Sequence, residues 1–147
     1  MPATTTITCD IAIIGGSLGG SAAALLLKEE GASVSLTCQP PWLGGQATAQ
    51  GVSAFDEHDH IETFGAPQGY MALRDAIRQH YIRQGAPAIL PTSVLGDHLP
   101  LNPGDGWVSR LCFEPRVAAE LLDAALADTP LYRPCRLLSA ERDGDRT

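Results

Sequence analysis

Glycines with a particular spacing follow the first apolar run of the chain. Gly15, Ser17 and Gly20 occupy the three fixed positions of the pattern G-x-G-x-x-G, with serine in place of the second glycine. The run that ends at Ile14 is rich in β-branched residues, and an alanine- and leucine-rich segment follows Gly20. This order of strand, tight turn and helix offers the N–H groups of a helix N-terminus to a pyrophosphate. Taken alone, the motif therefore indicates either a dinucleotide site over residues 15–20 or only a tight turn with close packing.

The end of the next strand determines how the ribose of a dinucleotide is held. Gly31 ends the helix, and residues 32–38 predict the second strand of a β-α-β unit that spans residues 6–38. In dinucleotide-binding β-α-β units that begin with this glycine motif, an acidic residue stands at the end of the second strand. Here Cys38 and Gln39 occupy that place. Losing a charge-assisted hydrogen bond of about 1.5–3 kcal/mol weakens binding roughly ten- to a hundredfold. We interpret Cys38 as a buried thiol rather than a redox thiol.

A second glycine-rich segment follows this unit. Residues 42–53 read W-L-G-G-Q-A-T-A-Q-G-V-S, and residues 54–58 continue as A-F-D-E-H. Together with F-E-P-R-V-A at residues 113–118, these segments resemble the N-terminal part of the bacterial FAD-dependent oxidoreductase family. The resemblance runs along the whole chain. It departs at Ser17 and Cys38, where most such flavoproteins have glycine and glutamate.

The resemblance implies an α/β fold, namely a Rossmann-like FAD/NAD(P)-binding domain of the glutathione-reductase type with a parallel sheet, incomplete at its C-terminal end. It implies FAD as the cofactor and oxidoreduction as the activity, although the 147-residue chain alone is not expected to be catalytically complete. The pyrophosphate would lie on the first glycine motif and the ribityl side of the flavin on the second. The presence of the second glycine segment favours FAD over NAD as the cofactor. The residues assigned to the cofactor are Gly15, Gly16, Ser17, Leu18, Gly19, Gly20, Cys38, Gln39, Trp42, Gly44, Gly45, Gln46 and Leu137.

The elements that position these residues follow from periodicity. Residues 1–147 are interpreted as one partial domain, with a flavin-contact loop over 39–58, a helical excursion over 66–128 and a strand over 131–142. The nearly continuous apolar run before Gly15 is typical of a central parallel strand covered on both faces. Apolar residues at helical spacing predict an amphipathic helix near residues 70–84, and Pro115 opens a further helix that ends near Asp128. The apolar stripe of the first of these helices consists of Tyr70, Leu73, Ile77 and Tyr81.

The sequence gives weaker evidence for a catalytic or metal-binding role of the other polar side chains. His58 is the one catalytic candidate, as a proton donor or acceptor near the flavin, because histidine titrates near neutral pH. His58 and His60 lie in an acidic loop, but no second ligand cluster accompanies them and no metal site is predicted. Three arginines are predicted to form a solvated helix face, and Arg116 is expected to pair with Glu120. The three are Arg74, Arg78 and Arg83.

Composition excludes several classes of partner. The net charge is −7, with basic residues scattered, so neither nucleic acid nor an anionic membrane is an expected partner. No apolar run approaches the roughly 20 residues of a membrane span, and the first residues lack the features of a signal peptide. The four cysteines show no C-x-x-C spacing, which favours free thiols in a cytoplasmic protein.

The last residues raise an alternative. Asp143 and Gly144 form a strong hairpin signal, yet only three residues follow them. This pattern predicts a chain that stops inside a fold, whose partner is the missing C-terminal half or another chain. The alternative to an oxidoreductase part is therefore a non-catalytic remnant, or a split subunit that completes its sheet by strand addition.

Overall fold

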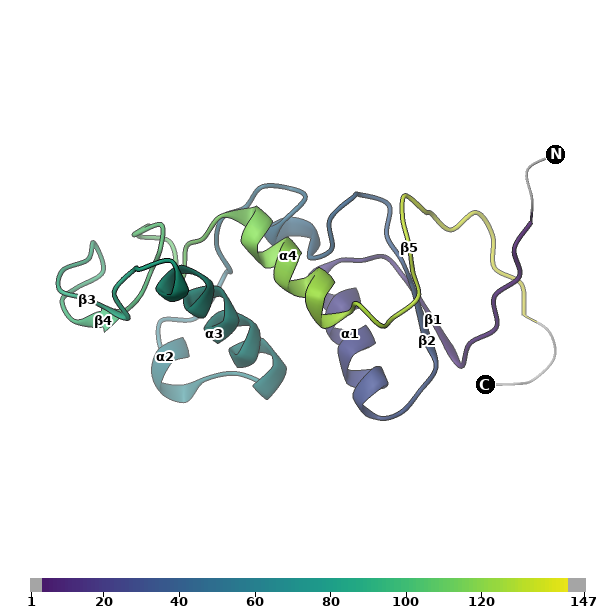
Figure 1. Cartoon of the computed structure of the whole chain (residues 1–147), viewed down its shortest axis with the longest axis horizontal. Helices are drawn as coiled ribbons and strands as arrows, with labels where there is room; N and C mark the ends of the chain where they lie inside the picture. Colours follow the sequence, from purple (N-terminus) through teal and green to yellow (C-terminus); the bar gives the residue numbers. More distant parts are fainter. Residues whose placement is uncertain (1–3, 143–147) are drawn as a thin grey trace.

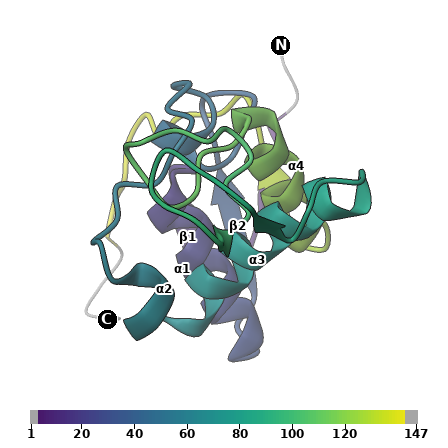
Figure 2. The ribbon, with the colours of Figure 1, turned by 90° about the vertical axis from the view of Figure 1, so that its left-hand side faces the viewer.

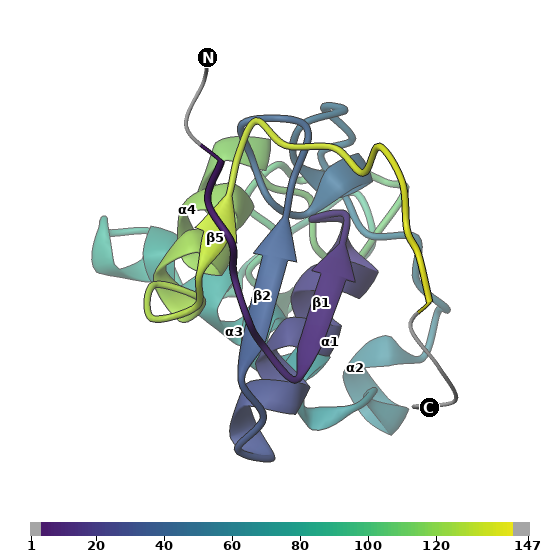
Figure 3. The ribbon, with the colours of Figure 1, turned by 90° about the vertical axis from the view of Figure 1, so that its right-hand side faces the viewer.

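The computed structural model describes residues 4–142, and its centre is a parallel sheet. Strands β1 (Ile11–Ile14), β2 (Val34–Thr37) and β5 (Leu131–Tyr132) lie in the order β1-β2-β5, and both strand pairs are parallel. Helix α1 (Leu18–Glu29) connects β1 to β2. Figure 3 shows α1 and α4 (Pro115–Ala125) behind the sheet, on the same face. The structure confirms an α/β fold, a partial Rossmann-like domain with a parallel sheet.

The prediction for the first strand was wrong in its place and extent. β2 is the central strand, whereas β1 is at the edge of the sheet and begins at Ile11. Across residues 4–142 no helix covers the second face of the sheet (Figure 3), and Ile14 is 51% exposed. An apolar run thus formed a strand without being buried on both faces. β-Branched residues favour extended backbone whatever their burial.

The long connection between β2 and β5 forms a second part of the molecule. It contains a short 3-10 helix (Gly45–Ala47), α2 (Ile61–Phe64) and α3 (Gln68–Arg83). It also contains β3 (Ile89–Leu90) and β4 (Leu99–Pro100), an antiparallel pair inside the excursion over residues 66–128 that was predicted to be helical. Figure 1 shows α2, α3 and the β3-β4 pair at one end of the molecule and the sheet at the other, with α4 between them. Figure 2 looks onto α2, α3 and the β3-β4 pair.

Two apolar clusters hold these parts together. The first lies between the sheet, α1 and α4, and contains Leu36, Leu43 and Leu122. The second lies between α3, α4 and the loop before α2; it is formed by Ala47, Phe55, Ile77, Leu111, Phe113 and Ala118. Leu18 and Leu73 pack against both clusters. The predicted stripe on α3 is confirmed, because its members are buried in the second cluster or pack against it.

The last strand is shorter than predicted. Only Leu131–Tyr132 pairs with β2, and residues 133–142 contain no strand. Pro134 has no N–H group to donate to the ladder, which breaks regular pairing at that position. One further contact follows, a hydrogen bond of 2.9 Å from the Cys135 N–H to the Cys38 carbonyl oxygen. The predicted hairpin at Asp143 and Gly144 lies outside the described residues.

Candidate functional site

The first glycine motif forms the turn between β1 and α1. Gly15 has a φ of +106°, which L side chains rarely adopt. Its N–H donates to the carbonyl oxygen of Thr37 at 3.1 Å, which ties the turn to β2. A Cβ atom on Gly20 would collide with the carbonyl oxygen of Gly15. The first and third glycines are therefore required by the backbone of the turn, the first for its conformation and the third for close packing.

Ser17, at the second motif position, is the N-cap of α1. Its backbone is extended, and its Oγ accepts a hydrogen bond of 3.2 Å from the Gly20 N–H. The next N–H group, that of Ser21, donates to the Ser17 carbonyl oxygen. The N–H group of Gly19 has no acceptor within residues 4–142, whereas the Leu18 N–H points to the Gly44 carbonyl oxygen in the bridge between Ser17 and Gly44. The Gly19 N–H remains available to an anion at the positive end of the helix dipole.

The second glycine pair packs directly against the first motif. The Gly44 N–H donates to the Gly16 carbonyl oxygen at 2.8 Å, and Gly44 forms a parallel bridge with Ser17. Gly44 and Gly45 have φ values of +98° and +56°. A Cβ atom on Gly45 would lie 3.2 Å from the Cα atom of Ser17. The twin glycines thus allow two loops, 27 residues apart in sequence, to meet at the N-terminus of α1.

A cavity of about 470 Å³ opens at this junction. Its volume falls within the range of small-molecule and cofactor sites, roughly 300–1,000 Å³. It is lined by Ser17, Leu18, Gly19, Gly44, Gln46, Ala47, Val52, Ala54, Phe55, Asp56 and Tyr70. Five predicted cofactor residues are in this lining, and Gly15, Gly16, Gly20 and Gly45 form the backbone around it. The glycine cradle, the free N–H group of Gly19 and the volume fit the phosphates of a dinucleotide.

The other predicted residues lie away from this cavity. Cys38 is fully buried, and a Cβ atom on Gly16 would collide with its sulfur. Burial raises the pKa of the Cys38 thiol, and the thiol donates to the Trp42 carbonyl oxygen at 3.6 Å. Gln39, Trp42 and Leu137 are exposed side chains outside the lining. Cys38 is thus a packing residue beneath the glycine turn, as a buried thiol was predicted to be.

The predicted catalytic candidate also lies outside the lining. His58 is exposed, and its Nδ1 accepts a hydrogen bond of 3.2 Å from the His60 N–H. Its place in the chain is two residues after Asp56, which does line the cavity. Within residues 4–142 no group of three histidine, cysteine or acidic side chains is arranged to hold a metal ion.

Six residues of the cavity wall are absent from the predicted site, namely Ala47, Val52, Ala54, Phe55, Asp56 and Tyr70. All but Tyr70 belong to the segment that carries the family resemblance, so a signal for them was present. Tyr70 was assigned to the apolar stripe of α3, and its ring indeed packs against Phe55 with centroids 5.3 Å apart. Its position in the first turn of α3 also places it in the lining. Helical spacing shows which residues of a helix are buried, but it does not show which of them line a cavity.

Two of the arginines predicted to be solvated are buried. Arg74 is fully buried and pairs with Glu57 and Glu62, while Arg78 also pairs with Glu62. Glu57 in turn accepts hydrogen bonds from the Tyr70 hydroxyl at 2.8 Å and the Ser109 hydroxyl at 3.1 Å. We call these residues the Glu57 network. Their charges are neutralised locally, which is the condition under which charged side chains are tolerated inside proteins.

Exposed pairs behave as the sequence indicated. Arg116 and Glu120 form an i, i+4 pair at 3.7 Å, as predicted, and Arg83 is exposed.

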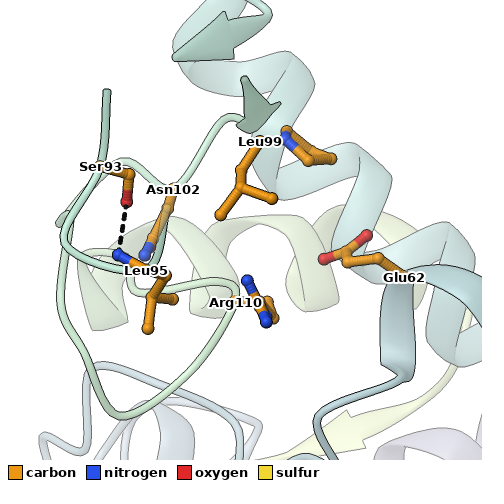
Figure 4. A pocket seen from close by; sticks show the side chains of 7 residues that line it. Glu62, Ser93, Leu95, Leu99, Asn102 and Arg110 are labelled. Carbon is orange, nitrogen blue, oxygen red and sulfur yellow. Dashed lines mark hydrogen bonds between the residues drawn. The ribbon is translucent and has the colours of Figure 1, made fainter. Parts of the chain in front are cut away.

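A second hollow, shown in Figure 4, lies between Leu95, Leu99 and Arg110. Its free volume is about 10 Å³, enough for one water molecule at most. The cavity at the N-terminus of α1 is therefore the candidate functional site.

Comparisons with known proteins identify the family of the chain. Along residues 4–142 no helix is long and apolar enough to cross a membrane, and all four cysteines are free. No curated protein and no solved structure matches the chain. The sequence model of one family, described as FAD dependent oxidoreductase, matches residues 10–147. The match begins just before β1 and includes both glycine motifs and Tyr70. The chain therefore belongs to the FAD-dependent oxidoreductase family, whose cofactor is FAD.

Proposed function

We propose that the chain is the N-terminal FAD-binding part of an oxidoreductase of the glutathione-reductase type, and that it holds the FAD pyrophosphate at the N-terminus of α1. The observation that carries this proposal is the unpartnered N–H group of Gly19 at the N-terminus of α1, where Ser17, Leu18 and Gly19 line a cavity of about 470 Å³. Backbone N–H groups at a helix N-terminus are a recurrent phosphate site, and no side chain needs to change shape to provide them.

Each part of the junction has a task in this proposal. The Ser17 oxygen is engaged with Gly20, so its O–H remains free to donate to a phosphate oxygen. Gly44 and Gly45 keep the second loop close enough for Gln46 to reach the ribityl side. The bound flavin supplies the transfer of hydride or electrons. The protein binds and orients it against the α1 N-terminus.

We also propose that this part of the protein does not complete the reaction alone. Of the residues that line the cavity, only Asp56 and Tyr70 carry a titratable group, and the lining contains no recognisable pocket for a substrate. A substrate domain and the rest of the flavin site would be supplied by further chain or by a partner. The four free cysteines support a cytoplasmic location, where thiols stay reduced.

The first test places a negative charge at the proposed phosphate site. Gly19 and Gly69 are both the second residue of their helices, and a Cβ atom fits at each. An acidic residue in the first turn favours the helix in both cases. We expect Gly19→Glu to weaken FAD binding at least tenfold in a fluorescence titration, and Gly69→Glu to leave it unchanged. We also expect ADP, which carries the same pyrophosphate, to compete with FAD. Equal FAD affinity in Gly19→Glu and the unmodified chain would exclude phosphate binding at α1.

The open edge of β1 favours a second candidate function, a subunit that completes its sheet with a partner chain. β1 pairs only with β2 among the described strands, and Ile11 and Ile14 are exposed beside its free edge. An unpaired strand edge is a site for strand addition. Light scattering together with hydrogen exchange tests this candidate. A single monomeric mass with fast exchange at residues 11–14 would argue against it.

A further inference from the structure

Part of the cavity wall is aromatic and lies on one side of the pyrophosphate site. Phe55 and Tyr70 line the cavity, with Asp56 beside them. No lining residue comes from β2 or from residues 38–43, where the adenosine end of a dinucleotide is expected in this fold. The cavity instead extends from α1 past Gln46 to the aromatic wall. If the pyrophosphate binds at α1, the part of FAD that reaches this wall is the isoalloxazine ring.

The orientation of Tyr70 is set by a buried set of charges. Its hydroxyl donates to the carboxylate of Glu57 at 2.8 Å, and Arg74 binds the same carboxylate. The side chains of Glu57 and Arg74 are 3% and 0% exposed. On the other side, the ring packs against Phe55, which packs against Phe113 with centroids 4.8 Å apart. Tyr70 therefore has both its oxygen and its ring held in place.

A purely structural role does not explain this arrangement well. Replacing a buried ion pair by apolar side chains of similar volume is often neutral or stabilising, so the Glu57 network is weak evidence for a contribution to stability. Tyr70 is the one member of the network that reaches the cavity. Burial and the Glu57 carboxylate both raise the pKa of the Tyr70 phenol, so the ring stays neutral beside a bound ligand.

A second tyrosine on the same helix provides a comparison within the chain. Tyr81 also packs against the second apolar cluster, and its hydroxyl also bonds to a glutamate, accepting from the Glu114 N–H at 3.0 Å. Burial raises its pKa as well. Tyr81 does not line the cavity. The two phenols thus share helix, burial and a glutamate partner, and differ in access to the proposed ligand.

We propose that Tyr70 is a positioning residue that places its ring against the isoalloxazine ring of FAD, held there by the Glu57 network. This inference rests on the proposed binding of FAD in the cavity. Aromatic rings at contact distance stabilise one another beyond the area they bury. A rigid ring at this wall fixes the flavin plane, whereas a mobile one would lose side-chain entropy on binding.

The test uses the fluorescence lifetime of bound FAD. A phenol in contact with an excited flavin gives up an electron readily and shortens the lifetime, whereas a benzene ring does not. We expect a short lifetime component in the unmodified chain, its loss in Tyr70→Phe, and its return in Tyr70→Trp, because indole is also easily oxidised. The matched control, Tyr81→Phe, keeps the short component. Circular dichroism verifies that each variant is folded.

The outcomes separate this inference from the proposed function. If the chain binds FAD but Tyr70→Phe leaves the lifetime unchanged, Tyr70 does not contact the flavin and the inference is wrong while FAD binding stands. If Tyr81→Phe removes the short component instead, the flavin lies elsewhere along α3. If the folded chain binds no FAD at all, both the proposed function and this inference fail.

Discussion

The Oγ atom of Ser17 accepts a hydrogen bond of 3.2 Å from the N–H of Gly20, across the first turn of α1. Serine at the second position of the glycine motif therefore caps the helix that the motif begins. The cap occupies the Gly20 N–H and leaves that of Gly19 without an acceptor in the described chain. A departure from the usual glycine pattern thus reinforces the helix N-terminus at which we place the phosphates.

The cap makes a prediction about stability. Removing a serine N-cap hydroxyl costs about 1 kcal/mol when alanine replaces it, but only a few tenths when glycine does. We expect Ser17→Ala to lower the free energy of unfolding by about 1 kcal/mol and Ser17→Gly by less than half of that. Urea unfolding followed by circular dichroism measures both. Equal losses in the two variants would mean that the hydroxyl does not cap α1.

The contact between the two glycine motifs makes a second prediction. Gly45 and Gly51 both have a positive φ, +56° and +76°, so alanine is strained by about 1 kcal/mol at either position. Only at Gly45 would the added Cβ press on Ser17, at 3.2 Å from its Cα; at Gly51 it meets nothing. We expect Gly45→Ala to destabilise the chain more than Gly51→Ala and to weaken FAD binding. Indistinguishable thermal unfolding of the two variants would contradict the close approach of the loops.

The Glu57 network makes a third prediction. Removing one partner from a buried ion pair costs roughly 3–5 kcal/mol, because the other charge is left uncompensated, whereas an exposed pair is worth about 0–1 kcal/mol. We therefore expect Arg74→Met to destabilise the chain severely. Arg116→Met, which breaks the exposed pair with Glu120, provides the control and changes stability by less than about 1 kcal/mol. Similar denaturation midpoints for the two variants would show that Arg74 is not buried among carboxylates.

The Cys38 thiol makes a prediction about alkaline pH. Burial raises its pKa in the folded state above the ordinary value of 9.0, so the unfolded chain loses this proton first as the pH rises. Fewer protons are then bound in the unfolded state, and the free energy of unfolding falls above about pH 9. Below that pH both states are protonated and the thiol has no effect. We expect Cys38→Ala to lose stability less steeply between pH 9 and 10. A slope equal to that of the unmodified chain would indicate an exposed thiol.

Local features of the sequence were sufficient to predict the centre of the site. The positions of Gly15 and Gly20 follow from the geometry of one tight turn, and the helix after them follows from its own residues. The pattern around Gly44 and Gly45 indicated only turns, and their role at the cofactor was implied by the family resemblance. The meeting of the two motifs was implied by the resemblance alone, since nothing in the spacing shows that the loops are neighbours.

Long-range relationships were the part that the sequence did not reveal. Whether β1 is an edge or a central strand depends on which strands join the sheet, not on its own apolar residues. Arg74 stands four residues after Tyr70 and three before Ile77, a spacing that places it on the same helix face. That placement was visible in the sequence. Its partners Glu57 and Glu62 come from a loop and a short helix whose folding no periodicity predicts.

The central claim, that the first turn of α1 binds the FAD pyrophosphate, is tested most directly by nuclear magnetic resonance. FAD is titrated into the ¹⁵N-labelled chain, and the backbone amide signals are followed. We predict the largest shift at Gly19, whose N–H group gains a phosphate acceptor, a further shift at the neighbouring Leu18, and smaller ones at Gln46 and Tyr70. Saturable binding that leaves the Leu18 and Gly19 signals in place, and moves others instead, would contradict the account.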